Sequence, residues 1–145
     1  MLNRLGAIGA IAALTLLSNG CRHAAARPAQ PPPEVRFARE FIRVLQDSGS
    51  VAVLPLATPK TRALNGFAPN MDVLRSVLAS SQATLTLAQW NAVPKSDRAP
   101  SLVHVVFKVQ GAGAPSALDL WIEEESGRFL LNTILIGRPN PEASR

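Results

Sequence analysis

The sequence predicts an α+β domain in which N-terminal helices pack on one face of a curved, mainly antiparallel sheet of about four strands. Three observations lead to this class. Apolar residues recur at helical spacing between residues 34 and 80, they alternate every second residue from residue 82 onward, and turn-forming residues separate the alternating segments. Helices followed by a run of strands are typical of an α+β domain.

The first segment is typical of a secretory signal peptide. Arg4 supplies a positive charge, residues 5–17 carry no charge over thirteen positions, and three short residues follow at 18–20. A basic start, an apolar stretch of about 7–15 residues and short residues at the cleavage site define such peptides. Thirteen helical residues span about 20 Å, against about 30 Å of membrane hydrocarbon, which disfavours a retained transmembrane helix. We therefore expect residues 1–20 to be removed on export.

Cys21 is the only cysteine of the chain, so no disulfide can form within it. It follows Gly20 directly after the apolar segment, an arrangement that resembles the lipobox of bacterial lipoproteins. The resemblance implies lipidation of the Cys21 sulfur with two acyl chains, cleavage before it, and acylation of the new amino terminus. That family usually carries Leu and a small residue where this chain has Ser18 and Asn19. A conventional cleavage, leaving a soluble periplasmic or secreted protein with a free thiol, is the alternative.

A proline-rich tether follows the cysteine. Residues 21–33 contain no large apolar side chain, and their prolines favour an extended conformation. By the same resemblance, Arg22 implies sorting to the outer membrane, so we expect a membrane-anchored protein on the periplasmic side of that membrane. The organisation predicted is one α+β domain over residues 34–137, with a flexible tail at 138–145.

The strongest helical pattern covers residues 34–47. Its apolar positions form one stripe: Val35, Ala38, Phe41, Ile42 and Leu45. On the opposite side, spacing predicts the ion pairs Arg36–Glu40 and Arg43–Asp47. Together with Arg39, these arginines form a basic flank that fits either phosphate groups or a solvated helix face.

Shorter helices follow. Residues 51–56 fit a helix or a strand equally well because Pro55 interrupts a short apolar run. Thr58 predicts an N-cap for a helix over residues 59–64. Asn70 predicts the cap of a helix over residues 71–80, with its core-facing positions at Met71, Leu74, Val77 and Leu78.

The strand region begins with alternating residues from Gln82 to Trp90, and a loop is expected over residues 91–101. Residues 102–110 predict a second strand, with Val103, Val105, Phe107 and Val109 on the face opposite His104. Residues 117–124 and 128–136 flank Ser126-Gly127 and predict a hairpin. A loop of even length makes paired residue numbers sum to 253. This register puts Leu118, Leu120 and Ile122 with Leu131, Thr133 and Leu135 on the apolar face, and Asp119, Trp121 and Glu123 with Leu130, Asn132 and Ile134 on the other.

The order of these elements resembles the nuclear-transport-factor-two-like superfamily, also called ketosteroid-isomerase-like, in which a bent sheet forms a cone around a pocket. The closing hairpin, from Leu118 to Ile136, carries most of the resemblance, which covers residues 34 to 137 by pattern. A cystatin-like helix-on-sheet domain is the alternative. In the cone family, a catalytic carboxylate base would lie on the concave face.

The candidate pocket or docking residues are His104, Asp119, Trp121 and Asn132. Asp119 is the only acid in the middle of a predicted strand, and His104 is the only histidine of the folded region. An isomerase would need a carboxylate base and a protonated donor in an apolar pocket, and the chain has no tyrosine to serve as donor. An exposed Asp119 and a locally hydrogen-bonded His104 are the structural alternatives.

The sequence predicts no cofactor, no metal site and no catalytic constellation. Two histidines and one cysteine form no ligand cluster, and no glycine-rich loop joins a strand to a helix. The net charge of +5 falls to +4 without Arg4, but the basic residues are scattered and few aromatics lie among them, which disfavours nucleic acid as a partner.

We therefore expect a cell-envelope lipoprotein whose domain is a binding or interaction module for an envelope protein or a small apolar ligand. A structural or assembly accessory that docks a partner protein is the second hypothesis. An isomerase- or hydrolase-type enzyme with Asp119 as base is the third and least favoured. An apolar cavity containing Asp119 or His104 would favour binding or catalysis, whereas an exposed apolar patch would favour docking.

Overall fold

A computed structural model describes residues 30–94 and 101–138, so the predicted signal peptide, Cys21, most of the tether and the tail from residue 139 lie outside the described residues. The helices are α1 (Pro33–Ser48), α2 (Ser50–Val53), the 3₁₀ helix η1 (Leu54–Leu56), α3 (Pro59–Arg62) and α4 (Phe67–Ser80). The strands are β1 (Thr84–Val93), β2 (Leu102–Gln110), β3 (Ala117–Glu125) and β4 (Arg128–Ile136). Within these ranges, no helix is long and apolar enough to cross a membrane.

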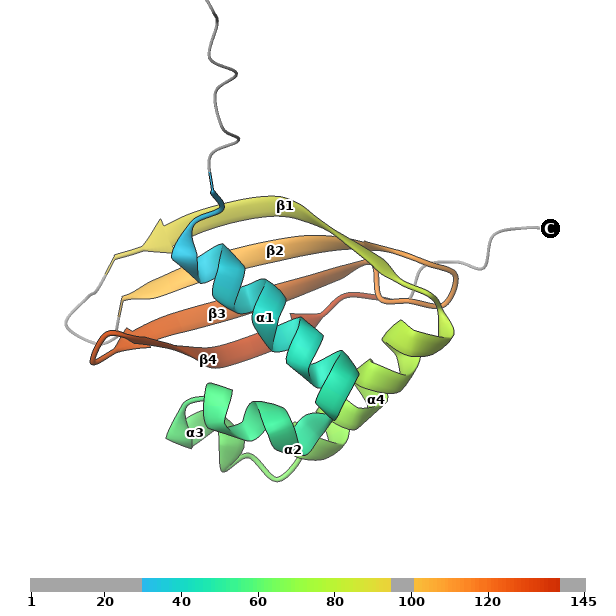
Figure 1. Cartoon of the computed structure of the whole chain (residues 1–145), viewed down its shortest axis with the longest axis horizontal. Coiled ribbons are helices and arrows are strands. Elements are labelled where there is room, and N and C mark those ends of the chain that lie inside the picture. Colours follow the sequence, from blue (N-terminus) through green and yellow to red (C-terminus); the bar gives the residue numbers. More distant parts are fainter. Residues whose placement is uncertain (1–29, 95–100, 139–145) are drawn as a thin grey trace, which may run out of the picture. The chain divides into compact units, whose positions relative to one another are not determined.

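The four strands form one open antiparallel sheet in the order β1-β2-β3-β4. Figure 1 shows α1 crossing one face of this sheet, with the shorter helices and α4 beyond its β4 side. Helices followed by an antiparallel sheet confirm the predicted α+β class. The core lies between α1, α4 and the covered sheet face, and its largest fully buried side chains include Phe41, Leu45, Met71, Leu78, Phe107, Leu118, Leu120, Ile122 and Leu131.

The predicted apolar stripe of α1 is confirmed, because the buried residues of this helix are Val35, Ala38, Phe41, Ile42 and Leu45. The helix ends at Ser48 and is followed by its C-cap Gly49, whose φ of 85° favours glycine. The ion pairing differs from the prediction on the exposed side. Arg43 binds Glu40 as well as Asp47, with its Nη2 2.6 Å from Glu40 Oε1 and its Nη1 3.0 Å from Asp47 Oδ2. Glu40 therefore pairs with the residue three positions after it and not with Arg36.

The segment that fitted helix or strand forms α2 and η1. Thr58 caps α3 as predicted, since its Oγ1 accepts a hydrogen bond from the Thr61 amide, but α3 ends at Arg62. The start predicted for α4 was wrong. This helix begins at Phe67, four residues before Met71, so Asn70 lies inside its first turn. Pro69 is tolerated there because the first amides of a helix have no partner within the helix.

β1 runs three residues further than predicted, to Val93, because Asn91, Ala92 and Val93 pair with His104, Val103 and Leu102. A bulge at Ala88 shifts the pairing between Leu87 and Gln89. Trp90 consequently pairs with the buried Val105 and lies on the helix-covered side of this edge strand, where its side chain stays 43% exposed.

The hairpin of β3 and β4 has the predicted two-residue loop, in which Ser126 and Gly127 both have positive φ. The pairs nearest this loop, such as Ile122 with Leu131, follow the predicted register. A bulge at Asn132 then shifts the rest, so that Trp121 pairs with Thr133 and Leu120 with Ile134. The predicted faces were therefore wrong beyond Asn132: Ile134 and Ile136 share the covered face with Leu120 and Leu118, whereas Thr133 and Leu135 lie on the open face.

Candidate functional site

Three of the four predicted site residues lie together on the open face of the sheet. The buried residues of β2 and β3, including Val105 and Leu120, face the helices. Side chains alternate along a strand, so His104, Asp119 and Trp121 project from the opposite face. His104 and Trp121 are direct cross-strand partners, and Asp119 is the partner of the next open-face residue of β2, Val106.

The geometry of this cluster is a stack with a nearby acid. The rings of His104 and Trp121 are 4.2 Å apart between centroids and 9° from parallel. His104 Nε2 lies 3.9 Å from Asp119 Oδ2, which is too long for a hydrogen bond. The imidazole is 18% exposed and the carboxylate 33% exposed. His104 Nε2 is buried and has no hydrogen-bond partner among the described residues. The cluster thus has a stacked aromatic centre, and four hollows formed by described residues are lined without His104, Asp119 or Trp121.

Asn132, the fourth predicted residue, lies at the bulge on the edge strand β4. Its Nδ2 donates a hydrogen bond of 2.9 Å to Glu123 Oε2, and its backbone oxygen accepts one from Thr61 Oγ1. The Thr58 amide also donates to the Leu131 oxygen. The bonds from Thr58 and Thr61 attach α3 to β4. The bond from Thr61 and the bond to Glu123 give hydrogen-bond partners to the extra residue of the bulge. The register predicted from the sequence would have made Trp121 the partner of Asn132, and the bulge separates them.

Beyond Asn132, no described residue forms a hydrogen bond with the outer edge of β4. Residues of an edge strand alternate between bonding the neighbouring strand and facing away from it. The Gly137 amide donates to the Ala117 oxygen, so the backbone groups of Leu135 also face β3 and those of Ile134 and Ile136 face outward. Among the residues of the described ranges, none supplies these outward groups with a hydrogen-bond partner.

Two apolar hollows flank this edge of β4. One of about 200 Å³ lies between α3, α4 and β4, and its apolar lining comprises Leu64, Phe67, Met71, Ile134 and Ile136. The other, of about 140 Å³, is lined by Val73, Leu74, Val77, Pro115 and Ile136. Leu64 is 60%, Val73 63% and Ile136 46% exposed, so both hollows open to solvent. We call these lining residues, with the outward backbone of Ile134 and Ile136, the β4 edge site.

No sequence pattern indicated this site, although the predicted residue Asn132 also lines the first hollow. Leu64 and Val73 could have indicated the site, because these apolar residues lie outside the helical stripes that fill the core. Each hollow is smaller than the roughly 300–1,000 Å³ of small-molecule pockets, but an aliphatic side chain of a partner fits in that space. The arrangement therefore suits an extended chain better than an enclosed small molecule.

The described residues contain no group of three or more His, Cys, Asp or Glu side chains positioned to hold a metal ion. Comparisons of the sequence with protein-family models and with curated proteins found no match.

Proposed function

We propose that the protein is an exported lipoprotein, acylated on Cys21, whose α+β domain is an interaction module that docks an extended segment of another envelope protein along β4. The observation that carries the docking part is the β4 edge site, which combines solvent-open apolar hollows with backbone groups that no residue of the described ranges pairs. Anchoring is supported by the uncharged stretch at residues 5–17, the single cysteine after it, and the start of α1 at Pro33.

The addition of a partner strand beside β4 would use both the outward backbone groups and the apolar hollows of the β4 edge site. An extended peptide beside β4 would hydrogen-bond the outward N–H and C=O groups of Ile134 and Ile136, and its alternate side chains would enter the hollows. Natural sheets usually shield an edge with charges, prolines or covering segments. Here the described hydrogen bonds from α3 reach β4 only as far as Asn132, and Leu135 and Ile136 stay exposed beyond it. Asp119 has no catalytic role in this proposal and lies on the open face of the sheet, away from the β4 edge site.

Anchoring is tested by fatty-acid labelling in the native host. Cys21→Ala should leave an unprocessed precursor that incorporates no label. Ser18→Leu combined with Asn19→Ala brings the sequence nearer to the usual lipobox and should speed processing. A Cys21→Ala chain that is cut and released like the wild type would contradict the proposal.

Docking is tested by photo-crosslinking from position 64. A photoreactive residue in place of Leu64 should crosslink to an extended segment of an envelope protein, identified by mass spectrometry. Ile136→Pro removes the outward N–H, a change that an edge strand tolerates, and should abolish the crosslink. Ile136→Ala trims the side chain but keeps the N–H, so part of the crosslink should remain. Equal crosslinking from position 108 on the open face, or a crosslink that Ile136→Pro leaves unchanged, would contradict the docking site.

A further inference from the structure

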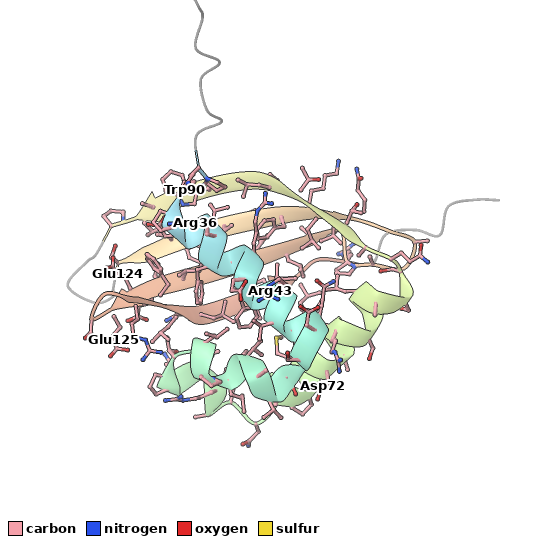
Figure 2. The ribbon with its side chains drawn as sticks, viewed as in Figure 1. Arg36, Arg43, Asp72, Trp90, Glu124 and Glu125 are labelled. Carbon is pink, nitrogen blue, oxygen red and sulfur yellow. The ribbon has the colours of Figure 1, made fainter. Side chains whose placement is uncertain are left out.

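A second surface lies along the seam between α1 and β1, at the end where the tether joins the domain. The exposed residues Arg36 and Arg39 belong to the first two turns of α1, and the Arg36 amide donates to the oxygen of Pro32, the last residue before the helix. Figure 2 shows Arg36 and Trp90 at the same end of the molecule, where the chain enters α1. We call Arg36, Arg39 and Trp90 the seam surface.

The neighbours of these residues place the seam surface on one side of the sheet. The Arg39 guanidinium carbon lies 5.9 Å from the centre of the Phe107 ring. Trp90 pairs with Val105, the next residue of β2 that shares a face with Phe107. Arg36 precedes Arg39 by about one helical turn, so both arginines and the indole border the same edge.

The charges of the seam surface are available to an anion. Arg43 is occupied by Glu40 and Asp47, whereas no acid forms an ion pair with Arg36 or Arg39 within residues 30–94 and 101–138. Glu34, the acid of the first turn, has its Oε2 buried, so that oxygen does not face the solvent. A guanidinium lying over an aromatic ring keeps its in-plane N–H groups free for phosphate oxygens.

We propose that the seam surface docks on the anionic phosphate headgroups of the bilayer that holds the acyl chains. Arginine pairs with lipid phosphates, and tryptophan favours the membrane–water interface. A few such residues bind a membrane only weakly on their own. The tether changes this, because about twelve residues reach at most about 40 Å and keep the domain at a high local concentration near the surface. The inference therefore rests on the anchor of the proposed function. Docking would leave the β4 edge site, on the opposite edge of the sheet, open to a partner.

The experiment uses the acylated full-length mature protein, reconstituted into vesicles by its own anchor. Trp121→Phe keeps an aromatic partner for His104 and leaves Trp90 as the only indole, since the chain has 2 tryptophans. The vesicles contain bromine-substituted lipids, with phosphatidylcholine alone or mixed with phosphatidylglycerol. Trp90 emission should be blue-shifted and quenched in the anionic vesicles and should recover as salt is raised, because salt screens the arginine–phosphate attraction.

Charge reversal tests whether docking depends on the seam surface itself or only on the net positive charge of the protein. Arg36→Glu with Arg39→Glu should lower the docked population roughly tenfold or more. Lys60→Glu with Arg62→Glu makes the same change in net charge on α3 and should leave the quenching unchanged. All four residues are exposed, and circular dichroism checks that each variant stays folded.

The outcomes distinguish the two proposals. Suppose that the protein floats with the vesicles but Trp90 is quenched equally in neutral and anionic lipid, or that both charge reversals have equal effects. Either result would contradict docking by the seam surface and leave the anchor intact. A protein that does not float with the vesicles lacks the anchor, which overturns the proposed function and this inference with it.

Discussion

The imidazole of His104 stacks on the indole of Trp121, with 4.2 Å between the ring centroids and 9° between the planes. The two residues are direct partners on β2 and β3, in the middle of the open face. Cross-strand aromatic pairs stabilise a sheet beyond their buried area. Because the ring nitrogen Nε2 has no hydrogen-bond partner in the described part of the chain, stacking is the contact that explains this position.

Replacing His104 tests that explanation. His104→Ala should lower the free energy of unfolding by about 1 kcal/mol, because the indole loses its stacking partner. His104→Phe keeps a flat ring and removes the polar nitrogen, so it should be neutral or stabilising in urea denaturation. A His104→Phe chain as unstable as His104→Ala would show that a polar contact of the imidazole matters more than stacking.

The corrected register of β4 predicts unequal roles for two neighbouring residues. Ile134 faces the core, so Ile134→Ala should cost about 2 kcal/mol of stability. Leu135 lies on the open face and is 55% exposed, so Leu135→Ala should cost less than about 0.5 kcal/mol. Thermal or urea unfolding measures both. The unshifted register, with Leu135 on the apolar face, requires the reverse order.

The hydroxyl of Thr61 should contribute more than its methyl group to the attachment of α3. Thr61 is buried, and its Oγ1 donates to the Asn132 oxygen and lies 2.9 Å from Thr58 Oγ1. Thr61→Val keeps the shape but leaves the partly buried Asn132 oxygen without this donor, which should cost about 1–3 kcal/mol. Thr61→Ser restores the hydroxyl and should recover most of the loss. Equal stability of the Val and Ser variants would contradict the bond.

The ion pair of Glu40 predicts a pH effect. The hydrogen bond from Arg43 lowers the pKa of Glu40 below its usual 4.5, so the ionised carboxylate favours the folded state. This stabilisation is fully present above the unfolded pKa and is lost as the pH falls through the lowered folded pKa. Carboxyl carbon NMR should show the pKa of Glu40 rising toward 4.5 in Arg43→Gln. Arg36→Gln is the control and should leave the pKa of Glu40 unchanged. An equal rise in Arg36→Gln would show that Glu40 pairs with Arg36, as the spacing predicted.

The fold class could be predicted because periodicity reports directly which side chains are buried. The stripe on α1 and the alternation in β2 each leave a repeating apolar pattern, and the buried residues follow it. Helix starts were harder to place. Asn70 is a good cap by residue type, but α4 begins at Phe67, whose 6% exposure shows that tertiary packing extends the helix.

The two bulges account for most of what the sequence did not reveal. A bulge adds one residue without changing the composition of a strand, so alternation continues while the faces exchange. The bulge at Ala88 carries Trp90 to the helix-covered side, and the bulge at Asn132 separates Asn132 from Trp121. Asn132 is held by Thr61, which lies 71 positions away in the sequence, so local patterns could not indicate it. The β4 edge site depends on the same shift, since it brings Ile134 and Ile136 to the covered face.

Intact-mass measurement of the protein purified from native membranes tests the central claim, lipid anchoring at Cys21, most directly. The proposal predicts a chain that begins at Cys21 and exceeds the mass of residues 21–145 by the thioether-linked diacylglycerol and an amide-linked acyl chain. Fragmentation should place all of this added mass on Cys21. A chain that begins at another residue and carries Cys21 as a free thiol would contradict the anchor.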